Sequence, residues 1–145
     1  MFGDVKGNNN RFEVITVSEV NFECGIAYYD CGIKPHIVVK DKNNKLFLGF
    51  EKNIICVDMS LDNIVFEKKL TSIFYEFIEV QSQNAVIAIC ELDIYVFNYE
   101  GKILWEMGLR EVINEFYVIE DEKLCIVYDD GDELIFSITE GKVIN

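Results

Sequence analysis

The hydrophobic and polar positions of this chain repeat with a long period. Three stretches share one pattern, an apolar run, a short polar turn and a second apolar run: Leu46–Met59 (LFLGFEKNIICVDM), Ala85–Asn98 (AVIAICELDIYVFN) and Leu124–Ser137 (LCIVYDDGDELIFS). Their starts at 46, 85 and 124 are 39 residues apart, twice, and the stretches align without a gap. A period near 40 residues is typical of repeat architectures. The sequence therefore predicts three copies of one small β unit between residues 36 and 145.

Each unit contains four short apolar runs, which we interpret as strands. In the second unit they are Phe77–Val80, Ala85–Cys90, Ile94–Asn98 and Ile103–Glu106. Asn, Asp and Gly fill the connections, and these residues tolerate the left-handed backbone of tight hairpins. Turns are predicted at Asp41–Asn44, Gln81–Asn84, Asp121–Lys123, Asp62-Asn63, Glu100-Gly101 and Glu140-Gly141. Four strands in about 39 residues predict an up-and-down antiparallel meander.

Residues 1–35 do not align with the repeats. Arg11–Val17 (RFEVITV) is rich in β-branched residues and predicts a strand, with Phe12, Val14 and Ile15 as its inward set. Asn21–Asp30 predicts a second strand, in which Gly25 marks a bulge or a close backbone contact. We expect this region to be either a degenerate unit or a cap.

Two segments before the strands of later units carry a competing pattern. Leu70–Phe77 and Leu109–Phe116 have apolar residues close to the helical spacing i, i+3, i+4, i+7. We interpret both segments as crossings between units that lead into a strand, with room for a short helix at the start.

Asn98–Glu106 (NYEGKILWE) resembles the end of a blade in quinoprotein-type (PQQ-like) β-propellers, where a Gly-Lys turn precedes an apolar strand carrying Trp. Ile138–Val143 and Ser60–Phe66 are similar to it more faintly. The resemblance implies four-stranded blades, but no residue matches a cofactor ligand, so we expect no cofactor. Trp105 is expected to be a large core or inter-sheet side chain. Three units are too few for a ring of about four to eight blades. The fold class is therefore all-β, a partial or small β-propeller, with a β-sandwich as the alternative.

Length and composition favour one folded domain over residues 1–145, since half of the residues are hydrophobic. No run of about 18 apolar residues is present, which predicts no membrane span. The first residues (MFGDVKGNNN) do not resemble a secretory signal. Five cysteines at irregular spacings do not form a disulfide framework, so we expect a reduced, cytoplasmic protein.

The charge is concentrated in the repeats. Residues 1–45 hold six basic and six acidic residues, so the whole net charge of −13 lies in residues 46–145. Between 111 and 133, nine acids face Lys123 alone, which gives −8. Such a surface repels nucleic acid and attracts a basic protein partner. The candidate partner-binding residues are the acids of two hairpin tips in one unit, which we expect to be presented together: Glu120, Asp121, Glu122, Asp129, Asp130, Asp132 and Glu133. A solvated acidic edge is the alternative interpretation.

No catalytic or metal-binding pattern stands out. The single histidine, His36, lies near Cys31, but no flanking signature supports a thiolate pair. The cysteines lack zinc-site spacing and are expected to be small core residues. Asp129–Glu133 resembles a calcium loop in its acids but lacks the terminal glutamate of an EF-hand, which favours an acidic hairpin tip. We therefore expect a protein that is not an enzyme and holds no metal.

The sequence leaves three hypotheses for function. The first is an acidic immunity protein, a class that this chain resembles in overall character, which would neutralise a basic toxin domain such as a nuclease by blocking its active site. The second is a structural or assembly module, a part-propeller completed by a homo-oligomer or by a larger subunit. The third is an enzyme whose site is built from scattered acids.

Overall fold

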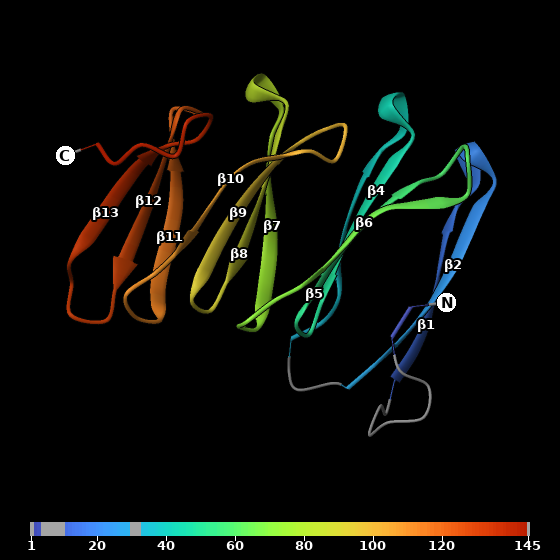
Figure 1. The fold of residues 1–145 in the computed structure, drawn as a ribbon, viewed down its shortest axis with the longest axis horizontal. Helices are drawn as coiled ribbons and strands as arrows, with labels where there is room; N and C mark the ends of the chain where they lie inside the picture. The colour runs from blue at the N-terminus through green and yellow to red at the C-terminus, as the bar shows by residue number, and fades with distance from the viewer. Residues whose placement is uncertain (1, 4–10, 30–32, 145) are drawn as a thin grey trace.

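The chain folds into four antiparallel β-sheets that stand side by side in an open arc (Figure 1). The structure is a computed structural model that describes residues 2–3, 11–29 and 33–144. Sheet A contains β1 (Arg11–Val17) and β2 (Phe22–Tyr28), and sheet B contains β3 (His36–Lys40), β4 (Lys45–Phe50), β5 (Asn53–Asp58) and β6 (Asn63–Lys69). Sheet C contains β7 (Phe74–Val80), β8 (Ala85–Cys90), β9 (Asp93–Asn98) and β10 (Ile103–Gly108), and sheet D contains β11 (Ile113–Ile119), β12 (Lys123–Tyr128) and β13 (Glu133–Ser137). The prediction of an all-β, partial-propeller fold is confirmed, and the two-sheet sandwich is wrong.

Each inner sheet buries both of its faces. We call the face toward the preceding sheet the backward face and the face toward the following sheet the forward face. On β4, Leu46 and Leu48 pack backward against sheet A, whereas Phe47 packs forward against sheet C. The middle strands β4, β5, β8 and β9 are therefore buried almost throughout. Burial on both faces explains why their sequences are continuous apolar runs rather than alternating patterns.

The repeat is not a uniform 39 residues. The second strand of the unit begins at Lys45, Ala85 and Lys123, so the structural spacing is 40 residues and then 38. Leu46 therefore corresponds to Val86 and Leu124, all of which pack backward, whereas Ala85 packs forward. The ungapped alignment was wrong by one residue in the middle unit. Such a slip exchanges the two faces of a strand, and the alignment hid it because both faces are apolar here.

Sheets B and C have the four strands that the meander predicts, in the order of the chain. In sheet D the described residues form three strands, and only an isolated bridge between Phe136 and Val143 marks the position of a fourth. The prediction of four strands is thus confirmed for two units and wrong for the third.

Sheet A is a degenerate unit made of the first two strands of a blade. A short 3-10 turn joins β1 to β2 and ends at Asn21 in the left-handed conformation, as the corresponding turns end at Asn44 and Asn84 in sheets B and C. The predicted inward set of β1 was wrong in part. Ile15 and Val17 pack on sheet B, whereas Phe12 and Val14 lie on the opposite face and are 55% and 53% exposed.

The register of β1 and β2 is continuous, so Gly25 is not a bulge. The Gly25 carbonyl oxygen instead accepts a hydrogen bond from the backbone N–H of Phe2 at 2.8 Å, which is the close backbone contact that was the other interpretation.

The two crossings contain no helix. Each makes a bend and enters a strand at Phe74 or Ile113. The backbone N–H groups of Leu70 and Leu109 donate to the preceding hairpin turn, to Lys52 O and Leu92 O, both at 2.8 Å. The helical spacing arose because the bend and the first strand residues both contribute inward apolar side chains, such as Leu70, Phe74 and Ile113, whereas Val112 is 39% exposed.

Trp105 joins sheets C and D, as expected of an inter-sheet side chain. Its indole Nε1–H donates to the backbone oxygen of Ile138 at 2.5 Å, and its ring lies 5.8 Å from that of Phe136. The ring lies so close to Gly141 that a Cβ there would be 2.6 Å from it. Phe66 on β6, the last strand of sheet B, corresponds to Trp105 on β10, the last strand of sheet C. Phe66 stacks on Phe97 of sheet C with 5.0 Å between ring centroids.

Candidate protein-binding surfaces

The predicted partner-binding acids lie at two separate places on sheet D. Glu120, Asp121 and Glu122 form the turn between β11 and β12. Asp129, Asp130 and Asp132 lie in the turn between β12 and β13, and Glu133 is the first residue of β13. These turns are at opposite ends of the six-residue strand β12, roughly 20 Å apart at 3.3 Å per residue. The expectation that one unit presents both tips together was wrong, because consecutive turns of a meander alternate between the two ends of the sheet.

The tip formed by Asp129 to Glu133 is held by a cation. The guanidinium of Arg110 lies 2.9 Å from Asp130 and 3.0 Å from Asp132, and it stacks over the Tyr128 ring at 4.3 Å. The backbone N–H of Asp132 donates to Asp130, and this bond, together with Arg110, lowers the pKa of the Asp130 carboxyl below its ordinary value. Part of the negative charge of this tip is therefore neutralised within the protein.

The other tip belongs to a larger acidic surface. Glu120, Asp121 and Glu122 are exposed and lie beside the turn that carries Glu140, since the backbone N–H of Ile138 donates to Glu122 O at 3.0 Å. We call Glu120, Asp121, Glu122 and Glu140 the acidic rim. Ser82 of sheet C donates to Asp121 at 3.3 Å, and Lys142 pairs with Glu140 at 3.2 Å. The rim thus presents four carboxylates with one paired lysine.

The forward face of sheet D lies at one end of the arc. Tyr117, Cys125 and Ile135 are directly opposite one another on the three strands, and their neighbours Phe116, Ile126 and Leu134 pack on sheet C. The face we call the D face is therefore apolar at its centre: Tyr117, Ile119, Cys125, Val127 and Ile135. Tyr117 is 42% exposed and covers Cys125, which is buried. Its hydrogen bond with the Cys125 thiol, with Glu133 nearby, raises the pKa of Tyr117 to about 12.

The backward face of sheet A lies at the other end of the arc. Its residues alternate with the buried Ile15 and Val17 on β1 and with Phe22 and Cys24 on β2. We call this surface the A face and define it by Phe12, Val14, Thr16, Glu23 and Gly25. The two ends of the arc therefore both present a sheet face with apolar residues, and Figure 1 shows these ends far apart along the long axis of the molecule.

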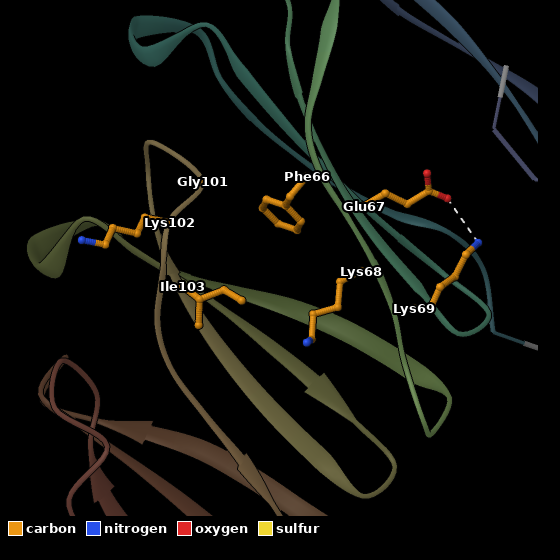
Figure 2. A pocket seen from close by; sticks show the side chains of 7 residues that line it. All are labelled: Phe66, Glu67, Lys68, Lys69, Gly101, Lys102 and Ile103. Atoms are coloured by element: carbon orange, nitrogen blue, oxygen red, sulfur yellow. Dashed lines mark ion pairs between the residues drawn. The ribbon is translucent and has the colours of Figure 1, made fainter.

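A groove lies between the outer strands β6 and β10 (Figure 2). Its volume is about 560 Å³, and its lining contains three of the 13 basic residues of the chain: Lys68, Lys69 and Lys102. Lys68 pairs with Glu106 at 3.4 Å, and Lys69 pairs with Glu67 at 3.2 Å, the dashed contact in Figure 2. Acids thus compensate two of the three lysines. This groove was not predicted from the sequence, although the adjacent lysines at 68 and 69 of an acidic chain were a usable signal.

The other residues singled out from the sequence have structural environments. His36 Nδ1 accepts a hydrogen bond from the backbone N–H of Phe77 at 2.9 Å, so the ring links sheets B and C. Cys24, Cys56, Cys90 and Cys125 are buried, as expected of small core residues. Burial raises the pKa of the Cys56 and Cys90 thiols to about 12. Cys31, considered and rejected from the sequence as a thiolate partner of His36, lies outside the described residues.

Among the residues that the structure describes, no three His, Cys, Asp or Glu side chains converge as a metal-binding group. The same residues form no helix of the length and hydrophobicity needed to cross a bilayer.

Comparison with known proteins identifies the fold alone. No family model and no curated protein matches the chain. The computationally designed Ika4 protein is similar with a TM-score of 0.57 at 14% identity, over 79% of this chain and 72% of that one. The β-propeller domain of Myceliophteria thermophila Cps50 (Swd1) has a TM-score of 0.56 at 14% identity, over 76% of this chain and 41% of its own. BamB from Moraxella catarrhalis has a TM-score of 0.52 at 14% identity, over 81% and 38%.

The chain therefore spans less than half of the length of the two natural propeller proteins. These matches confirm the propeller part of the resemblance seen in the sequence. The assignment to PQQ-like propellers stays a prediction.

Proposed function

We propose that this protein is a non-catalytic binding module whose open arc is completed by a protein partner. The observation that carries the proposal is the pair of end faces, the D face and the A face. Within the arc, every forward face is covered by the next sheet, and Ile87 and Val96 of sheet C, which correspond to Cys125 and Ile135, are fully buried. The end faces have the same construction, and no sheet of the described residues covers either of them.

The exposed apolar area favours a partner on physical grounds. Burial of apolar surface contributes about 25 cal/mol per Å², so a sheet packed on either end face gains stability as the internal junctions do. An uncovered terminal unit of a repeat protein is normally capped by polar residues. Phe12, Val14 and Tyr117 are instead about half exposed at the two ends.

A photo-crosslinking residue at position 117 tests the proposal in cells that naturally make the protein. Replacement of Tyr117 by benzoylphenylalanine keeps an aromatic ring on the D face. The matched control has the same residue at Leu61, which is 70% exposed in the turn between β5 and β6. We expect a light-dependent adduct of one defined mass from position 117 and none from position 61. Absence of an adduct at 117, or the same adducts from both positions, would contradict the proposal.

A second function is favoured by the acidic rim, namely the neutralisation of a basic protein, as an immunity protein neutralises a toxin domain. Its four carboxylates lie together at one end of sheet D, and one of them, Glu140, is paired with Lys142. A concentrated charge of one sign accelerates the association of an oppositely charged partner by about 10- to 1,000-fold. The rim would then cover the cationic active site of the partner.

This second function is tested with the product of the neighbouring reading frame, provided that it is basic. One variant reverses the rim (Glu120→Lys, Asp121→Lys, Glu122→Lys), and a control reverses the other tip (Asp129→Lys, Glu133→Lys). If the rim binds the partner, the association rate falls more than tenfold in the first variant only, and its salt dependence flattens. Equal effects in both variants would show that the net charge matters but the rim does not.

A further inference from the structure

We infer that the partner of the end faces is a second copy of this chain, with the D face of each copy packed on the A face of the other to close a two-chain ring. This inference rests on the proposed binding function and names its partner. It concerns the two sheets at the ends of the arc, which lie farthest apart in Figure 1.

The internal junctions already use the same pair of faces. At each one, the forward face of a sheet packs on the backward face of the next sheet, as Phe47 and Cys56 of sheet B pack against Val86 and Phe97 of sheet C. The D face is the forward face left over at one end of this series. The A face is the backward face left over at the other end. A second copy therefore offers each end face the kind of surface that covers its counterparts inside the arc.

A glycine and an aromatic ring meet at two of the three internal junctions, and the end faces offer the same pair. A Cβ on Gly49 would lie 2.3 Å from the Phe74 ring of the next sheet, and a Cβ on Gly141 would lie 2.6 Å from the Trp105 ring of the preceding one. At the ends, Gly25 gives the A face a flat centre opposite Val14, and Tyr117 projects from the D face. Only a glycine lets a ring approach the backbone so closely.

The charge distribution favours this head-to-tail arrangement over a symmetric contact between two D faces. Residues 111–133, which form most of sheet D, carry nine acids and one lysine, a net charge of −8, whereas residues 11–29, which form sheet A, carry three glutamates and Arg11, a net charge of −2. Two D faces in contact would bring two such acidic segments together, which costs free energy by like-charge repulsion. Head-to-tail packing places each strongly acidic segment beside sheet A, which carries much less charge.

The count of sheets is consistent with closure. A twofold rotation about the ring axis lets each copy use one D face and one A face, so no end face is left over. Two copies contribute eight sheets. That number lies within the range of about four to eight blades in propeller rings.

The experiment measures mass in solution by light scattering after size exclusion, with Tyr117→Lys on the D face, Val14→Lys on the A face and Leu61→Lys as the control. At about 100 μM chain, a dissociation constant of about 10 μM leaves most of the protein in the complex. Two copies of the 16.8 kDa chain are expected for the wild type and the control. Each end-face variant alone is expected to be monomeric, and circular dichroism verifies that each is folded.

Mixing the two end-face variants makes the test specific. The Tyr117→Lys copy keeps an intact A face and the Val14→Lys copy keeps an intact D face, so an equimolar mixture should form one junction and regain the mass of two chains. If the wild type is monomeric, or if only Tyr117→Lys dissociates the pair, the inference is overturned. Crosslinking from position 117 to a different protein would also overturn it, while leaving the proposed binding function intact.

Discussion

Trp105→Phe is the substitution that best tests how the sheets are held together. The change keeps an aromatic ring between sheets C and D but removes the indole N–H that donates to Ile138 O at 2.5 Å. The Ile138 side chain is fully buried, so its carbonyl oxygen has poor access to water. A buried acceptor left without its donor costs about 1–3 kcal/mol. The smaller ring also loses part of its packing against Gly141. We expect Trp105→Phe to reduce the free energy of unfolding by about 2 kcal/mol.

The assay is urea denaturation followed by far-ultraviolet circular dichroism. Trp105 is the only tryptophan, so the fluorescence of the wild type reports on the junction of sheets C and D alone. In a cooperative domain the fluorescence and circular dichroism transitions of the wild type coincide. If the fluorescence transition comes first, sheet D unfolds separately from the rest, as the nearest-neighbour contacts of a repeat protein allow.

Leu104→Ala is the matched control, because the neighbouring Leu104 lies on the same strand and is exposed on the outside. It should change the free energy of unfolding by less than about 0.5 kcal/mol. A similarly small effect of Trp105→Phe would refute the view that the indole hydrogen bond stabilises the junction. The presence of Phe at the equivalent place between sheets B and C shows that a smaller ring is compatible with the fold, so the variant is expected to remain folded.

Three further predictions follow from local geometry. Gly141→Ala should destabilise the protein by about 2–3 kcal/mol in urea titrations, because the new Cβ would clash with the indole of the preceding sheet and φ is +69°. The control is Gly131→Ala, where φ is +88° but a Cβ would have no atom within 4 Å. It should cost only the backbone strain of about 1 kcal/mol. Asp58 accepts hydrogen bonds from the hydroxyl and backbone N–H groups of the following turn, and these bonds lower its pKa to about 2. The ionised Asp58 therefore stabilises the fold above its ordinary pKa of 3.8, and this stabilisation is lost as the pH falls toward 2. Between these two pH values the melting temperature of the wild type should fall more than that of Asp58→Asn. Arg110→Gln should raise the pKa of Asp130 toward its ordinary value in an NMR titration, and an unchanged pKa would show that the backbone hydrogen bond alone lowers it.

The sequence was sufficient for the strands and the tight turns because both are local. Asn, Asp and Gly residues between the apolar runs predicted the turns that end at Asn44 and Asn84. The left-handed backbone conformation of these two residues confirms both turns. The one-residue error in the repeat was not visible, since a strand buried on both faces reads the same in either register. The ungapped alignment also hid the greater length of the third hairpin turn, Asp129–Asp132, which has four residues where Glu51-Lys52 and Glu91-Leu92 have two.

The candidate site was harder to predict, because it depends on which end of a sheet each turn occupies. The seven predicted acids are close in sequence, but the structure places them in two groups at opposite ends of β12. Arg110, from the crossing that precedes β11, forms an ion pair with Asp130 in the second group. That contact could not be predicted, because Arg110 and Asp130 are 20 residues apart and belong to different connections. The sequence did contain a sign that sheet A is the first half of a blade. An Asn ends the turn between the first two strands of sheets A, B and C, at positions 21, 44 and 84.

The open arc also limits how large an assembly of this chain can become. A head-to-tail contact that does not close leaves one D face and one A face free at every size, so it continues into a filament, whereas a contact that closes after two copies leaves none. The four sheets of one copy stand side by side with the two end sheets far apart, as Figure 1 shows, and a second copy closes the ring when each copy turns through half of the circuit. The measured mass should therefore stop at two chains as the concentration rises. A mass that keeps growing would mean that the arcs form an open spiral, and the two-chain ring would be wrong even though the faces that meet are those named here.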